Sequence, residues 1–284
     1  MVSCILALYL ALPGAIPLSD RGVRLKPDTT TVYDGGDRGV RLKPDTTTVH
    51  DGGARGGGTR GVRLQPDLTA DALYARREDL ASAKQAAAIW AERLQKNPKD
   101  FEAAWKLARA RYWLGGHGPE PERKASLQAG IQAGRAAVAA EPNRPHGHFW
   151  IAANMGALAE SFGLRQGLKY RGDIKNELLT VLKLDPAFQQ GSADRALGRW
   201  YYKVPGLFGG SKKQSEQHLR ASLGYGPNNT ASRFFLAETL RALDRPQEAR
   251  AELQKVLDAP IDPDWGPEDR DFKERARRLL ASVR

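Results

Sequence analysis

The chain has 284 residues, of which 41% are hydrophobic and 27% charged, a balance typical of a soluble globular protein. Its formal net charge of +11 would suit a nucleic-acid-binding protein. However, basic and acidic residues alternate along the chain instead of forming a basic block, which argues against that class. The single cysteine, Cys4, excludes a disulfide framework, a thiolate metal site and cysteine catalysis in the globular part.

The first segment, residues 1–19, has no charged residue and contains an apolar run that resembles the core of a secretory signal peptide. The run is too short to predict a membrane span. A basic start and a clean cleavage site are missing, so a short buried or frayed segment is the alternative. We expect a periplasmic or otherwise exported protein that associates with the membrane through its N-terminus.

Residues 20–69 are repetitive. Residues 20–36 recur as residues 37–53 with one change, His50 in place of Tyr33, and a degraded third copy follows at 60–69. The unit is rich in Gly, Asp and Thr and has too few apolar residues to offset the entropy of ordering it. We predict a disordered tether, and a repeat that binds phosphate or cell wall is the alternative.

From residue 70 onward, prolines at fixed places mark a structural repeat. Pro98, Pro142, Pro186, Pro227 and Pro260 recur at intervals of about 33 to 44 residues. Apolar residues between them follow the helical period of tetratricopeptide repeats (TPRs). The sequence therefore predicts an all-α, TPR-like solenoid over residues 70–284, with about five helix pairs.

The last repeat and the C-terminal segment show the pattern most clearly. The final segment is predicted as a capping helix, because Pro267 and the acidic residues after it favour a helix start and a solenoid must cover its open end. The residues predicted to be buried are Leu236, Ala237, Leu240, Ala249, Leu253 and Val256 in the last repeat and Phe272, Ala276, Leu279, Leu280 and Val283 in the cap.

The middle repeats are longer than a standard TPR, and we assign the additional residues to insertions between the two helices of each pair. The proposed insertions are residues 115–123, 161–173 and 203–213, with Gly115 as a helix C-cap before the first. In a solenoid, insertions at equivalent points emerge on one face, which often binds a partner.

No catalytic motif is present, so no enzyme activity and no cofactor are predicted. His146 and His148 could offer ring nitrogens to a metal, but residues two apart on a helix do not face each other, and a surface or helix-start role is favoured. No metal site is predicted.

Two sets of side chains at helical spacing could bind a small ligand. Trp150 and Asn154 share one helical face, and the alternative is a core amide that pins neighbouring helices. Arg195, Arg199 and Tyr202 share another face; two guanidiniums there suit a carboxylate, and the alternative is a salt-bridged seam between repeats.

The segments WIAANMGALAES, GLKYRGDIK, GRWYYKVPGLFGGSKKQ and DPDWGPED resemble those of the T-component (TatT) family of tripartite ATP-independent periplasmic (TRAP) transporters. The resemblance covers about residues 70–284 and implies a helical protein that docks a periplasmic solute-binding protein and assembles as a homo-oligomer, with a trimer as the form that the family suggests. It also implies a cavity for a small organic ligand, to which we add Lys169. The N-terminus departs from the family, since it has no convincing lipobox.

The segment around Pro205 is the one most specific to that resemblance. We predict that it forms a cavity rim or subunit contact and has no chemical role; the residues are Tyr201, Lys203, Pro205, Leu207, Phe208, Gly209 and Gly210. A general TPR scaffold that binds a protein segment, with no small ligand, is the alternative function.

Overall fold

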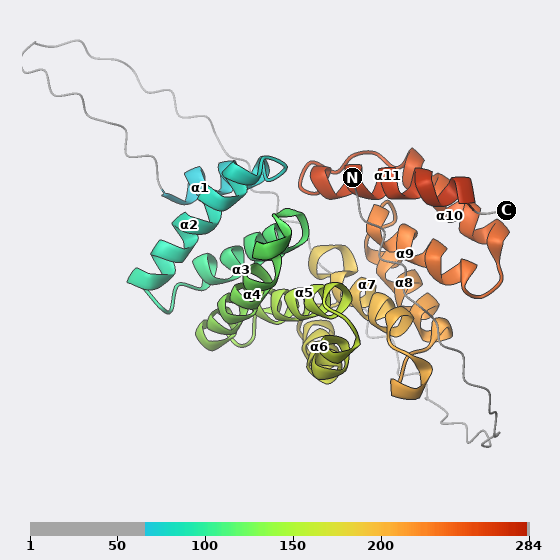
Figure 1. Cartoon of the computed structure of the whole chain (residues 1–284), viewed down its shortest axis with the longest axis horizontal. Helices are drawn as coiled ribbons and strands as arrows, with labels where there is room; N and C mark the ends of the chain where they lie inside the picture. Colours follow the sequence, from blue (N-terminus) through green and yellow to red (C-terminus); the bar gives the residue numbers. More distant parts are fainter. Residues whose placement is uncertain (1–65, 283–284) are drawn as a thin grey trace, which may run out of the picture. The chain divides into compact units, whose positions relative to one another are not determined.

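The computed structural model describes residues 66–282 and is helical throughout that range (Figure 1). The predictions for residues 1–19, and most of the predicted tether, lie outside it. No helix within 66–282 combines the length and apolarity needed to cross a membrane. The elements are α1 (Pro66–Ala75), α2 (Leu80–Lys96), α3 (Phe101–His117), α4 (Glu120–Ala140), α5 (Pro145–Ser161), α6 (Leu164–Leu184), α7 (Phe188–Lys203), the 3₁₀ turn η1 (Gly206–Phe208), α8 (Lys212–Tyr225), α9 (Thr230–Arg241), α10 (Pro246–Asp258) and α11 (Gly266–Ser282).

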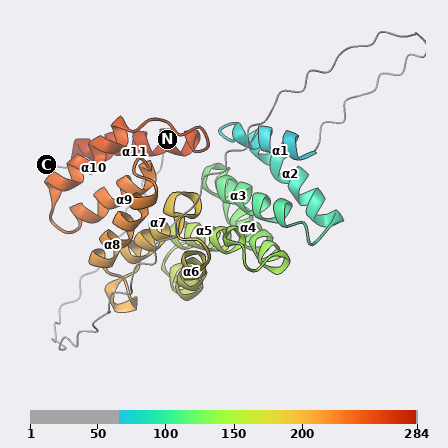
Figure 2. The same cartoon turned by 180° about the vertical axis from the view of Figure 1, so that it is seen from behind.

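The helices form five antiparallel pairs, α1–α2 to α9–α10, followed by α11 as a cap, so the predicted fold class is confirmed (Figures 1 and 2). From α3 onward, each odd-numbered helix packs on the next odd-numbered one, whereas consecutive even-numbered helices of the described array have no comparable contact. The odd-numbered helices therefore form an inner layer and the even-numbered helices an outer one.

Short polar side chains begin several of these helices, as helix-capping rules require. The side chains of Asp79, Asp100, Ser211 and Asn229 each accept a hydrogen bond from a backbone amide in the first turn of α2, α3, α8 and α9. These are amides that the helix itself leaves without an acceptor. The turns between helices are therefore fixed locally, and each pair folds back on itself.

The predicted insertions are wrong in two of three places, because the additional residues lengthen helices instead of forming loops. α3 continues to His117, so Gly115 lies inside it, against Leu127, and Gly118 is the C-cap. The second segment is mostly the first part of α6. Only the third forms a real loop, with η1 between α7 and α8. Helical period alone cannot distinguish a longer helix from a loop rich in Gly and charged residues.

The buried apolar residues form two main clusters. One extends from Ala70 to Tyr201, across α1–α7, and the other from Leu219 to Ala276, across α8–α11. All six residues predicted to be buried in the last repeat have no exposed surface, and Ala276 of the cap likewise has none. Phe272, Leu279 and Leu280 of the cap are only partly buried, and Val283 lies outside the described residues. Beside the second cluster, the α8–α9 contact includes a buried hydrogen bond between the hydroxyls of Ser215 and Thr239, 2.9 Å apart.

α7 begins with an unusual left-handed turn. Gln189, Gln190 and Gly191 have φ values of 47°, 59° and 69°, a conformation that costs energy for residues other than glycine. The turn directs the Gln190 side chain toward later parts of the chain, where its amide donates to Asp262 Oδ2 (2.9 Å) and accepts from Asn229 Nδ2 (2.9 Å). These bonds connect the start of α7 to the segments that precede α9 and α11.

Candidate interaction surface

The inner layer presents a surface that we call the inner face: the sides of α3, α5, α7, α9 and α11 that carry Tyr112, Glu160, Arg195, Arg199, Glu238 and Arg275. Tyr112 on α3 is 39% exposed, yet burial raises the pKa of its phenol. Charged groups of α5, α7 and α11 act on it as well, among them Glu160 and Arg275. Tyr112 therefore lies on the side of α3 that faces charged groups of the other inner helices.

A row of ion pairs crosses three helices of the inner face. Arg199 of α7 donates to both oxygens of Glu160 on α5 (3.0 and 2.9 Å) and to Glu238 on α9 (2.6 Å). Burial opposes the charges of Arg199 and Glu160, but their mutual attraction outweighs it, so the pKa of Glu160 is lowered and that of Arg199 raised. The pairs form a salt-bridged seam between repeats, so the Arg199 guanidinium is already occupied by protein carboxylates.

The same spacing separates both pairs: Arg199 lies 39 positions after Glu160 and 39 before Glu238. Thr230 and Asp269 are also hydrogen-bonded partners 39 positions apart. Residues 39 positions apart therefore face each other on neighbouring inner helices of the C-terminal half.

Arg195 lies one helical turn before Arg199, but its surroundings are different. Within residues 66–282 it has no ion pair with a carboxylate, and its Nη1 is buried without a hydrogen-bond partner there. Burial lowers its pKa to about 10, and Tyr112 is the side chain that acts against this shift. Of the two arginines predicted to bind a carboxylate, Arg195 is the one that remains uncompensated.

Asn154 and Trp150 lie at the buried base of this surface. Asn154 is fully buried, and its Nδ2 donates to the backbone oxygens of Ala108 (3.1 Å) and Trp150 (2.7 Å). This is the arrangement expected of a core amide that joins α3 to α5. Trp150 is 3% exposed and its ring contacts Tyr112, with centroids 5.6 Å apart. Neither side chain is open to a ligand in this conformation.

The remaining predicted ligand residues are not brought together with Arg195. Lys169 is exposed on the outer helix α6, with its ammonium 4.9 Å from the ring centre of Tyr170. The ring of Tyr202 lies beneath the ammonium of Lys212, 3.7 Å away. A cavity of about 290 Å³ lies on the outer side between α4 and α6, lined by Gln128, Ala129, Ile131, Gln132, Arg135 and Tyr170. It contains none of the predicted ligand residues.

The loop after α7 divides the predicted rim residues into a packed and an exposed group. Tyr201 is buried and stacks on His218, with ring centroids 5.3 Å apart. Gly210 is needed because a Cβ there would lie 1.7 Å from the Val204 oxygen. Lys203, Pro205, Phe208 and Gly209 are exposed, and Leu207 is 90% exposed. The loop thus presents an apolar tip to solvent, as a subunit contact would require, and that role stays a prediction.

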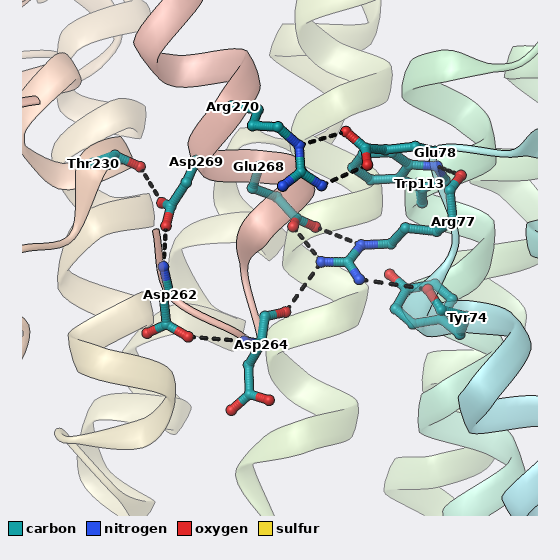
Figure 3. Close-up of polar contacts among 10 residues, drawn as sticks. All are labelled: Tyr74, Arg77, Glu78, Trp113, Thr230, Asp262, Asp264, Glu268, Asp269 and Arg270. Carbon is teal, nitrogen blue, oxygen red and sulfur yellow. Dashed lines mark hydrogen bonds and ion pairs between the residues drawn. The ribbon is translucent and has the colours of Figure 1, made fainter. Parts of the chain in front are cut away.

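The first and last parts of the array are joined by side chains (Figure 3). Arg77, after α1, donates to both carboxylate oxygens of Glu268 on α11 and to the Asp264 backbone oxygen (3.1 Å). The Arg77 side chain is only 5% exposed and lies against the rings of Tyr74 and Trp113. We call these contacts the closing contact.

A second ion pair reinforces the closing contact with the charges reversed: Glu78 of the first part accepts from Arg270 of α11, with 2.9 Å to its Nε. The start of α11 is in turn fixed by Asp269, which accepts from the Thr230 hydroxyl (2.6 Å) and the Asp262 amide (2.8 Å), as Figure 3 shows. The DPDWGPED segment, noted in the sequence as part of a family resemblance, therefore positions Glu268 and Arg270 to close the array.

The histidines serve packing and local polar contacts. His146 is surrounded by the rings of Phe101, Trp105 and Phe188, with centroids 4.7 to 5.6 Å away. His148 contacts Glu177 on α6, with 2.6 Å between Nδ1 and Oε2. Within residues 66–282, no group of three or more His, Cys, Asp or Glu side chains is placed to hold a metal ion.

The paired helices and the two layers define a TPR-like α-solenoid. A family model described as "Regulator of microtubule dynamics protein 1-3" matches residues 68–216, more than half of the chain. The chain therefore belongs to that family. It is a different family from the T-component family that the sequence resembles.

The solved structure of a thermophilic TPR protein supports the fold. TTC0263, a thermophilic TPR protein of Thermus thermophilus, superposes with a TM-score of 0.57 at 23% identity, over 76% of this chain and 97% of that one. Pseudomonas aeruginosa PilF gives a TM-score of 0.46 at 16% identity, over 77% of this chain and 93% of its own. The MamA protein gives 0.44 at 12% identity, over 68% and 91%. No curated protein matches the sequence.

The sequence alone did not indicate two features, Tyr112 of the inner face and the ion pair of the closing contact. Tyr112, which is 39% exposed on α3, was not among the residues predicted to bind a ligand. The Arg77–Glu268 pair has no local sequence signal, since its partners lie 191 positions apart. The DPDWGPED motif was the available signal, because a turn followed by acidic residues at a helix start is a common place for arginine contacts.

Proposed function

We propose that the protein is an interaction scaffold that holds an extended segment of a partner protein along its inner face. The observation that carries the proposal is the inner face itself, which presents an exposed aromatic ring, Tyr112, and a cation without a carboxylate partner, Arg195. Aromatic residues and arginine contribute most strongly to protein recognition. The TPR fold supports the proposal, because solenoids use extended concave surfaces for binding.

Hydrogen exchange with a bound peptide tests this proposal. A displayed pool of short random peptides would be selected against the full chain, and exchange would be compared with and without the peptides obtained. We expect added protection in α3, α5 and α7, whose inner sides would be covered. Protection confined to α4, α6 and α8, or no peptide binding at all, would contradict the proposal.

The family description suggests a narrower function, since it names regulators of microtubule dynamics. Such regulation needs binding to a protein polymer, which a scaffold of this kind would provide. Co-sedimentation of the full chain with purified microtubules tests it directly. A chain that remains in the supernatant at all microtubule concentrations would remove this function and leave the scaffold proposal intact.

The TRAP-transport role implied by the sequence resemblance has no support from the comparisons, and the general scaffold fits them better. The narrower role stays a prediction with its own test, cross-linking in the native host. Recovery of a periplasmic solute-binding protein with this chain would support it. A cross-linked complex without such a protein would count against it.

A further inference from the structure

Arg195 differs from the other arginines of the inner face in lacking a carboxylate partner. Arg199 has Glu160 and Glu238, and Arg275 is 3.5 Å from Asp271. The acidic neighbour of Arg195 in the sequence, Asp194, is directed toward α8, where it contacts His218 at 2.7 Å. The Arg195 charge is therefore compensated by no carboxylate of the described structure.

The 39-residue spacing of the contacting pairs indicates why this charge has no partner. Glu160 lies 39 positions before Arg199, and Glu238 lies 39 positions after it. The places equivalent to these beside Arg195 are taken by Gly156 on α5 and Phe234 on α9. The row of ion pairs that runs through Arg199 is thus interrupted one helical turn away, because neither position 39 residues from Arg195 carries an acidic side chain.

The glycine position also leaves room. A Cβ added to Gly156 would meet no heavy atom within 4 Å beyond its own helix and chain neighbours. Most other helical glycines of α4 and α5 are packed closely; at Gly130, an added Cβ would lie 2.2 Å from the Asn154 oxygen. Open space beside an unpaired guanidinium is what a binding site for a carboxylate requires.

We propose that Arg195 binds a carboxylate of the partner segment, in the open space above Gly156. This inference rests on the proposed scaffold function and names the chemical group recognised there. A carboxylate in this place would form an ion pair with Arg195, as Glu160 does with Arg199. Tyr112, on the inner helix α3, is the one side chain of the described structure whose charge is found to act on the pKa of Arg195.

The first test compares peptide binding by the wild type with that of Arg195→Met. We expect the affinity for the selected peptides to fall at least about tenfold, the effect of losing one charge-assisted hydrogen-bonded pair. Arg135→Met is the matched control, since it removes an exposed arginine on the outer helix α4 and should leave affinity unchanged. Arg195→Met should melt no lower than the wild type, because it removes an uncompensated charge.

The second test adds the missing carboxylate to the protein. Gly156→Glu places an acid 39 positions before Arg195, the spacing that separates Glu160 from Arg199. The new carboxylate should pair with Arg195 and compete with the peptide, so the affinity for the peptide should fall at least about tenfold. Gly156→Gln has nearly the same size without the charge, so the difference between the two variants isolates the ion pair. Equal affinities for these two variants would overturn the inference.

Chemical variants of the peptide identify the source of the carboxylate. Amidation of the C-terminus removes one source, and replacement of Asp and Glu by Asn and Gln removes the other; whichever change abolishes binding shows which carboxylate Arg195 holds. Peptides that protect the inner helices but bind Arg195→Met as well as the wild type would refute the carboxylate site and leave the scaffold function standing. Failure of every peptide to bind the wild type would refute both.

Discussion

Arg77 and Glu268, 191 positions apart in the sequence, form an ion pair with two hydrogen bonds that joins the first repeat to the capping helix. The guanidinium is nearly buried, while the Glu268 side chain is 25% exposed. A pair of this kind is costly to break from one side, because the remaining charge stays desolvated. The closing contact is therefore expected to affect both stability and the separation of the two ends.

Glu268→Gln should lower the free energy of unfolding by about 2–4 kcal/mol, since Arg77 would remain buried without a counter-charge. Arg77→Met combined with Glu268→Leu should recover much of that loss, because no buried charge remains. Urea unfolding followed by circular dichroism measures both values. The control is Arg270→Gln, which removes an exposed pair with Glu78 and should cost less than about 1 kcal/mol.

The same variants test whether the contact closes the array. Spin labels at Lys84 and Arg277, introduced as cysteines with Cys4 replaced by Ser, would report the distance between α2 and α11. In the wild type we expect one narrow distribution. Glu268→Gln should broaden it toward longer distances, and an unchanged distribution would show that the closing contact is not what holds the ends together.

Close packing between α4 and α5 gives a second prediction. Gly130→Ala places a methyl group 2.2 Å from Asn154 Oδ1, inside the contact that holds α3, α4 and α5 together. We expect a loss of about 1–3 kcal/mol or more, as for overpacked cores. Gly116→Ala is the control: it lies exposed in α3 with free space around it, and should stabilise by up to about 1 kcal/mol. Thermal unfolding of both variants decides the point.

His146 predicts a dependence of stability on pH. Burial among aromatic rings, with Arg144 nearby, lowers its pKa below the usual 6.5. Below about pH 6.5 the unfolded chain therefore binds a proton that the folded protein resists, and stability falls as the pH drops toward the folded pKa. Because the ring is only partly buried, the loss should be about 1 kcal/mol or less.

Denaturation between pH 8 and pH 5 measures that effect. His146→Phe keeps an aromatic ring at the site and has no titrating group, so its stability should change less than that of the wild type over the same range. Parallel pH profiles for the two proteins would show that His146 does not contribute.

The exposed tip of the loop after α7 gives a prediction on assembly. If Leu207 contacts another subunit, Leu207→Ser should lower the mass measured by light scattering, without loss of helicity. Because Leu207 is 90% exposed, its replacement removes no core contact, and a change in mass would report assembly and not folding. An oligomer of unchanged mass would remove the loop from the interface, and a monomeric wild type would remove the predicted homo-oligomer.

The architecture could be predicted because it depends on local, repeated signals. Proline spacing and apolar stripes such as Leu236, Leu240 and Leu253 gave the five helix pairs and the cap. Those residues pack within one repeat or against its neighbour, so their spacing in the sequence is sufficient to predict the helices and their pairing. The seam through Arg199 was likewise one of two alternatives derived from helical spacing.

The rest depends on contacts that no local pattern encodes. The long helices α4 and α6 contain glycines and charges that also suit loops, and only packing against neighbours decides between the two. Arg195 and Arg199 look alike in the sequence. They differ because the residues 39 positions away are Gly156 and Phe234 for the first, and two glutamates for the second. Only the packing of the inner helices shows that residues with this spacing face each other.

The closing contact gives this array a boundary that open solenoids lack. In a linear stack, the terminal repeats have one neighbour each, and unfolding starts there by fraying. Here the first pair contacts its successor on one side and α11 on the other, so neither end is free. Unfolding of any one helix pair would then remove contacts from neighbours on both sides. The helical unit should therefore unfold more cooperatively than a linear array of the same length.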